Sequence, residues 1–186
     1  MLKISQFETP WKHWMIDNLI ETSDFKLIQE ELINSTVVFK KLHDDPDEIQ
    51  FSVLPHLDLA KRLLSPEFKS YLENITSSQL EFYQPGAIQW RRMTPESPEF
   101  LPHVDFVDGP CLVMLYYVSP AWTKEKGGEL ILFENKDSTL NDPKTKCIEP
   151  QENRMVIFFN NTENWHSVQK VIDWTRYVVF AEWRVL

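Results

Sequence analysis

The C-terminal part of the chain, from about residue 79 onward, carries a series of short apolar runs separated by turn-forming residues. The runs are rich in Val, Ile, Phe and Tyr, and they read QLEFY, CLVMLYYV, ELILF, MVIFF and RYVVFAEW. β-Branched and aromatic side chains favour strands, and short strands with turns between them are typical of a β-sandwich or barrel. This pattern predicts that the last hundred or so residues form a β core.

The first 78 residues have a different periodicity. Apolar residues recur at helical spacing around Phe25 and Leu32, and again from Leu57 to Ile75. Ser65-Pro66 is expected to divide the second stretch, because Ser suits an N-cap and Pro the first helical position. The expected organisation is a single α+β domain over residues 1–186, with mainly helical support in 1–78 and the β core in 79–186.

The charge of the chain excludes several classes of partner. There are 19 Lys and Arg residues against 28 Asp and Glu residues, which gives a net charge of −9. A binder of duplex nucleic acid needs a basic face, and so does a polybasic membrane-surface protein.

No apolar run approaches the ~18 residues of a membrane-spanning helix, and the N-terminus does not resemble a signal peptide. These features together predict that the protein binds neither membrane nor nucleic acid. The chain has only two cysteines and no CxxC, which favours a reducing compartment, so we expect a cytoplasmic protein.

Three residues could form a metal site. His103 and Asp105 stand two positions apart, so in a strand both side chains point to one face. His166 comes just before the last strand-like run. Two imidazoles and one carboxylate make the facial triad of non-haem Fe(II) oxygenases, which leaves three metal positions open. An H-x-D tripeptide alone is common by chance, so the hypothesis depends on further residues.

Arg176 and a glycine pair supply such residues. Arg176 lies in the last run, where a guanidinium could bind the distal carboxylate of a metal-bound dicarboxylate in bidentate fashion. Gly127 and Gly128 have no Cβ, so the chain could turn tightly there beside a ligand. The ordinary alternatives are an arginine on a solvated strand end and a plain loop.

Seven short motifs occur in a fixed order between about residues 80 and 185. They are YQPG at 83–86, PHVD at 102–105, LYYV with PAW at 115–122, GGELILF at 127–133, IEP at 148–150, NRMVIFF at 153–159, and HSVQ with RYVVFAEW within 166–183. In order and spacing they resemble the 2-oxoglutarate/Fe(II) dioxygenase superfamily. The resemblance is strongest to the prolyl 4-hydroxylase branch, which includes the hypoxia-inducible-factor prolyl hydroxylases.

This resemblance implies a double-stranded β-helix, a jelly-roll or cupin-like barrel, with N-terminal supporting helices. It implies roles for seven residues: His103, Asp105 and His166 as Fe(II) ligands, Arg176 and Tyr117 as 2-oxoglutarate-binding residues, and Tyr83 and Trp183 beside the cosubstrate pocket. The aspartate in the triad favours hydroxylation over halogenation, because an alanine there would open a coordination site for halide.

The implied activity is hydroxylation of an unactivated C–H bond by Fe(II), O₂ and 2-oxoglutarate, which is decarboxylated to succinate. The implied substrate is a prolyl residue in a peptide or protein. Free proline or another small molecule is an alternative substrate, because fold does not fix substrate. From a different class, a non-catalytic 2-oxoglutarate or iron sensor, or a β-sandwich binding module, stays open. Oligomeric state is not predicted.

The segment between the first two motifs is longer than the family's usual link. Residues 87–102 include Trp90, Arg91 and Arg92 and a Pro-rich stretch. We hypothesise that this segment forms a lid or substrate-recognition loop, and the alternative is a solvent-exposed insertion.

Overall fold

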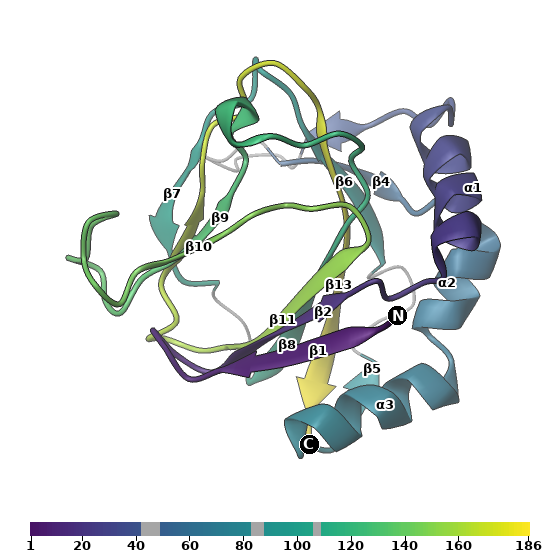
Figure 1. The fold of residues 1–186 in the computed structure, drawn as a ribbon. Helices are drawn as coiled ribbons and strands as arrows, with labels where there is room; N and C mark the ends of the chain where they lie inside the picture. The colour runs from purple at the N-terminus through teal and green to yellow at the C-terminus, as the bar shows by residue number, and fades with distance from the viewer. Residues whose placement is uncertain (42–48, 83–87, 106–108) are drawn as a thin grey trace.

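The computed structural model describes residues 1–41, 49–82, 88–105 and 109–186. They form two antiparallel sheets that face each other, with the helices packed outside the larger sheet (Figure 1). The larger sheet has the strand order β1 (Lys3–Phe7), β2 (His13–Asp17), β11 (Arg154–Asn160), β8 (Cys111–Tyr117), β13 (Arg176–Val185), β6 (Gln89–Met93), β4 (Gln50–Val53) and β3 (Lys40–Lys41), and β5 (Leu80–Phe82) also pairs with β13. The smaller sheet has the order β10 (Lys146–Ile148), β9 (Leu130–Leu132), β12 (His166–Val168) and β7 (Phe100–His103).

This architecture confirms the predicted α+β fold with a double-stranded β-helix. Each of the five apolar runs contains a strand: β5, β8, β9, β11 and β13. The central strands of the larger sheet are β11, β8 and β13, and all their pairings are antiparallel. A short 3₁₀ helix, Lys124–Lys126, precedes the glycine pair that leads into β9.

The N-terminal part combines helices with strands. Its helices are α1 (Thr22–Ile33), α2 (Leu57–Leu63) and α3 (Pro66–Thr76). The Ser65 hydroxyl accepts a hydrogen bond from the Phe68 backbone N–H at 3.1 Å, so Ser65 caps α3 as expected. The strands of this part belong to the larger sheet, where β1 and β2 extend one side and β3 and β4 the other. Both additions depend on pairing with distant strands, which local helical periodicity does not reveal.

The two faces of the larger sheet serve two separate cores. The face toward the helices packs Trp90, Tyr116 and Trp183 against helix residues such as Phe25 and Leu72. The opposite face, which we call the inner face, packs against the smaller sheet. Its buried residues include Val113, Tyr117, Val156, Phe158, Val178 and Phe180. Neighbouring residues of one strand therefore enter different cores, as the alternation of a strand requires.

The long segment before His103 is mostly regular structure. Residues 89–93 form β6, which lies between β13 and β4 in the larger sheet, and Trp90 is fully buried there. The following turn is held by hydrogen bonds between Ser97 and Thr94. The lid hypothesis is therefore wrong for residues 89–93, and Ala87 lies outside the described residues. Within the described parts of the chain, no helix has the length and apolar character needed to cross a membrane.

Candidate metal centre

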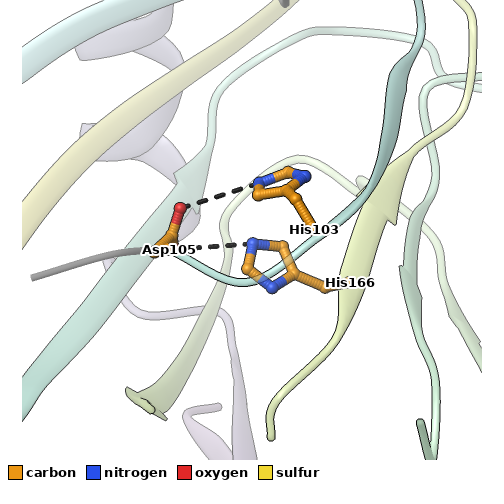
Figure 2. A group of neighbouring side chains, drawn as sticks. All are labelled: His103, Asp105 and His166. Atoms are coloured by element: carbon orange, nitrogen blue, oxygen red, sulfur yellow. Dashed lines mark ion pairs between the residues drawn. The ribbon is translucent and has the colours of Figure 1, made fainter. Parts of the chain in front are cut away.

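The smaller sheet brings His103 and His166 together. His103 ends β7 and His166 begins β12, and the two residues are directly paired across the strands. Their ring centres lie 4.5 Å apart. Asp105 follows β7 and points back at both rings, with Oδ1 3.6 Å from His103 Nε2 and Oδ2 3.5 Å from His166 Nε2 (Figure 2). One donor atom from each residue lies within 4.8 Å of the other two, so a single ion could contact all three.

Backbone carbonyls fix how the two imidazoles present their nitrogens. His103 Nδ1 lies 2.7 Å from the Leu101 carbonyl oxygen, and His166 Nδ1 lies 3.0 Å from that of Asn164. A carbonyl only accepts, so in each ring Nδ1 carries the hydrogen and donates it. In the neutral ring Nε2 then has a free lone pair, and it is Nε2 that faces Asp105. Metal-binding histidines are commonly oriented in this way.

Burial and charge favour the metal-binding protonation states of His166 and Asp105. Burial lowers the pKa of His166, and this effect outweighs the carboxylate of Asp105, which acts to raise it. Burial acts to raise the pKa of Asp105, but the neighbouring His103 and His166 side chains and Arg91 lower it overall. A neutral imidazole and an ionised carboxylate are the protonation states that bind a metal ion.

Arg176 is a buried guanidinium whose donors are not used up. It begins β13 on the inner face, is 5% exposed, and directs Nη1 toward Met93 Sδ at 4.0 Å. In the described part of the chain, neither Nε nor Nη2 has a hydrogen-bond partner, and the same holds for the hydroxyl of nearby Tyr117. Leaving such groups unpaired away from water costs free energy. An anion with two oxygens would fit the planar guanidinium, so the site suits a carboxylate.

Gly128 allows the chain to pass close to Arg176. Its φ is +82°, and a Cβ at this position would lie 3.2 Å from Arg176 Cδ and 3.3 Å from Trp174 Cζ2. The glycine pair noted in the sequence is therefore next to the predicted anion-binding residue rather than in an unrelated loop.

Trp183 does not lie at this site. The expectation that it lies beside the cosubstrate pocket was wrong. It belongs to the helix-side core, where its ring meets that of Phe82 edge to face at 5.1 Å. Trp183 is separated from Arg176 by an odd number of positions along β13, so the two side chains point to opposite faces. Tyr117 does face the same core as Arg176. Tyr83 lies outside the described residues.

Three residues of the inner face were not identified from the sequence: Phe158, Phe180 and Glu182. The Phe158 ring lies 5.2 Å from that of His166, and Arg91 stacks its guanidinium carbon 3.4 Å from the centre of the Phe180 ring. Glu182 is the third. An even number of positions separates it from Arg176 along β13, so its side chain points to the inner face, whereas that of Trp183 points to the helix side. Counting in twos from Arg176 along RYVVFAEW would have identified Phe180 and Glu182 as inward-facing.

Comparison with known proteins extends these observations. The family model described as the 2OG-Fe(II) oxygenase superfamily matches residues 88–183, a range that includes the triad and Arg176. Prolyl 3-hydroxylase OGFOD1 from Xenopus laevis is 26% identical over 171 residues, covering 88% of this chain and 32% of that protein. The Mus musculus protein of the same name is 23% identical over 171 residues, covering 88% and 30%. The chain thus spans about a third of the length of these curated relatives.

Solved structures share the fold at low sequence identity. A Trichoplax adhaerens prolyl hydroxylase, in complex with a hypoxia-inducible-factor peptide fragment, has a TM-score of 0.71 and 19% identity, over 93% of this chain and 83% of that one. A Pseudomonas putida prolyl-4-hydroxylase has a TM-score of 0.67 and 15% identity, over 98% and 92%. HygX from Streptomyces hygroscopicus, with nickel and 2-oxoglutarate bound, has a TM-score of 0.64 and 12% identity, over 92% and 82%.

Proposed function

This chain belongs to the 2OG-Fe(II) oxygenase superfamily, and on that premise we propose that it is a single-domain dioxygenase that hydroxylates a C–H bond of its substrate. One observation carries the proposal: a His103–Asp105–His166 cluster on the smaller sheet is combined with a buried arginine on the inner face of the larger sheet, two of whose nitrogens have no hydrogen-bond partner among the described residues. The cluster suits a divalent metal and the arginine a carboxylate, and the family's cosubstrate offers both a chelating end and a distal carboxylate.

Fe(II) would be held by His103, Asp105 and His166. Two imidazole nitrogens and one carboxylate oxygen leave three positions open on a six-coordinate ion, enough for a chelating 2-oxoglutarate and O₂. When bound, Fe(II), O₂ and 2-oxoglutarate supply an oxidant for an unactivated C–H bond, and 2-oxoglutarate leaves as succinate and CO₂ while one oxygen atom enters the substrate. The hydrogen bonds from the two Nδ1 atoms to backbone carbonyls would hold the imidazoles in their binding orientation.

Arg176 would bind the C5 carboxylate of 2-oxoglutarate. Its unpaired nitrogens and the unpaired hydroxyl of Tyr117 are buried on the same face, so a single carboxylate could engage both residues. Burial raises the pKa of Tyr117, which keeps its hydroxyl protonated and able to donate. Gly128 would let the backbone before β9 pass close to Arg176 at this end of the site.

The proposed substrate is a prolyl residue in a peptide or protein. Two kinds of likeness support it: the curated relatives are named prolyl 3-hydroxylase, and a structural neighbour is a prolyl hydroxylase in complex with a peptide fragment. A small-molecule substrate is the second candidate, because another neighbour, HygX, has been solved with hygromycin B bound.

The proposed function is tested first without O₂. Anaerobic addition of Fe(II) and 2-oxoglutarate should produce the metal-to-ligand charge-transfer band in the wild-type protein and not in Asp105→Ala. Asp58→Ala, which removes an exposed carboxylate on α2, is the matched control and should keep the band. A wild-type protein without the band would be a sensor of another kind or a binding module rather than a dioxygenase.

The second test identifies the substrate. The loaded protein is exposed to O₂ with prolyl peptides, free proline and other free amino acids, and succinate and oxygen-labelled products are measured by mass spectrometry with ¹⁸O₂. Hydroxylated peptides support the main proposal. Hydroxylated small molecules with unmodified peptides would establish the second candidate instead.

A cytoplasmic location is also part of the proposal. Cys111 and Cys147 are both free, and a reducing compartment keeps thiols in that state. Fractionation of cells that produce the tagged full-length protein tests this, and recovery from the medium or a membrane fraction would contradict it.

A further inference from the structure

Glu182 stands on the inner face in the same row as a residue that contacts the triad. Phe158 of β11 pairs with Val113 of β8, and Val113 pairs with Glu182 of β13. Directly paired residues point to the same face, so these three side chains form one row across the larger sheet. Phe158 and Val113 belong to the inner core, and the Phe158 ring lies 5.2 Å from that of His166. Two strand spacings, about 10 Å, separate Glu182 from Phe158 in this row.

Arg176 lies at the opposite end of the same inward-facing series. Arg176, Val178, Phe180 and Glu182 alternate along β13, so about 20 Å of strand separates the two charged residues. On the proposed function, 2-oxoglutarate would extend from Arg176 toward the triad. Glu182 therefore borders the other side of the metal site, where a substrate would approach.

The charge of Glu182 has no partner in the described part of the chain, where it forms no hydrogen bond or ion pair. Burial and the negative charge of Asp105 raise the pKa of Glu182, although Arg91 acts in the opposite direction. Arg91 is engaged elsewhere, because it stacks on Phe180 and its Nε donates to Gln89 Oε1 at 2.7 Å. A half-buried carboxyl is costly unless a cation or hydrogen-bond donor meets it.

We propose that Glu182 determines substrate specificity by binding a positively charged group, an ammonium or a guanidinium, close to the carbon that is hydroxylated. This inference rests on the proposed function and names the substrate class. The net charge of −9 supports it, because a protein with a net negative charge attracts cations. The cation could come from a Lys or Arg next to a prolyl residue in a peptide, or from the amino group of a small molecule.

The test measures binding as well as turnover. Anaerobic protein loaded with Fe(II) and 2-oxoglutarate is titrated with matched prolyl peptides whose neighbouring residue is Lys, norleucine or Glu, and with small molecules with and without an amino group. The wild-type protein should bind the cationic ligand about tenfold more tightly than its neutral match, since a charge-assisted contact contributes about that much. Glu182→Gln should abolish this preference, and Glu182→Lys should reverse it toward the Glu peptide. Glu30→Gln, an exposed site on α1, should keep the wild-type preference.

The outcomes separate this inference from the function on which it rests. The charge-transfer band and the melting temperature of each variant report whether the protein is loaded and folded. A preference for Lys peptides identifies a basic side chain as the cation, and a preference confined to free amines identifies a small molecule; both support the role of Glu182. A loaded wild-type protein without a preference, or a Glu182→Gln protein that keeps it, overturns the inference alone. A wild-type protein without the band overturns both.

Discussion

The guanidinium carbon of Arg176 lies 5.1 Å from the centre of the Tyr117 ring, where the start of β13 passes the end of β8. Neither partner satisfies the other: the Tyr117 hydroxyl and two arginine nitrogens are buried without hydrogen bonds in the part of the chain that the structure describes. Such a pair is costly in the ligand-free protein and becomes favourable when an anion arrives. This relationship makes Arg176 the first residue to test.

Replacing Arg176 by Gln should weaken 2-oxoglutarate binding about 10- to 100-fold, because charged hydrogen bonds contribute about 1.5–3 kcal/mol. The measurement is the 2-oxoglutarate concentration that half-saturates the charge-transfer band at fixed Fe(II) without O₂. Arg62→Gln, an exposed arginine of α2, is the control and should bind normally. Equal affinity in Arg176→Gln and wild type would remove Arg176 from the cosubstrate site.

Gly128→Ala should disturb the position of Arg176 by steric contact. The new Cβ would lie 3.2 Å from Arg176 Cδ, and φ at this position is +82°, so we expect a loss of about 1–2 kcal/mol of stability and weaker 2-oxoglutarate binding. Gly109→Ala is the control, because its φ is +105° but a Cβ there would meet no atom of the described residues within 4 Å. Gly109→Ala should lose stability by backbone strain and keep cosubstrate affinity; the same loss of affinity in both variants would contradict the steric argument.

Trp183→Phe should affect stability and leave cosubstrate binding unchanged. Trp183 is packed in the helix-side core, so the smaller ring leaves space there and lowers the free energy of unfolding by about 1–2 kcal/mol. Urea unfolding measures the first effect and the 2-oxoglutarate titration the second. A large change in 2-oxoglutarate affinity with normal stability would show that Trp183 takes part in the cosubstrate site.

Metal-free protein should lose stability as the pH falls below 6.5. Burial lowers the pKa of both His13 and His166 below the ordinary value of 6.5, so the unfolded chain takes up protons before the folded protein does. The free energy of unfolding therefore decreases from about pH 6.5 downward, and below about pH 4 Asp105 adds to the loss because its folded pKa is also lowered. Urea unfolding at several pH values checks this.

His166→Gln and His13→Gln serve as the variants for the pH experiment. Each removes one of the two titrating groups, so each should show a smaller decrease between pH 6.5 and pH 5.5 than the wild type. Stability that is independent of pH over this interval in the wild type would show that neither histidine is held neutral by burial.

Local chemistry made much of the fold predictable. The five apolar runs contain strands, and Ser65-Pro66 starts a helix, because strand propensity and capping act over a few residues. The triad could be proposed because H-x-D and a later histidine occur together with Arg176 and a series of motifs in a fixed order, and the structure brings the donor atoms of the three residues within reach of one ion.

The errors have physical causes that lie beyond local sequence. Gln89–Met93 was expected to be part of a loop, but its pairing with β13 and β4 makes it a strand. Strand β2 pairs with β11, which is more than a hundred residues away in sequence, and β1 joins the sheet by pairing with β2. Trp183 was misplaced by a single position, and in a strand one position reverses the direction of the side chain.

Side chains alternate along β8 and β13, so each of these central strands contributes residues to two separate cores. Even-numbered positions of β13 from 176 to 182 face the metal side, whereas the odd-numbered positions from 177 to 183 pack toward the helix-side core. A substitution in one set therefore meets a different group of neighbours from a substitution in the other. A single inserted or deleted residue would exchange the two sets along the strand. We expect lineages of this fold to tolerate changes of side chain in these strands and to confine changes of length to the loops.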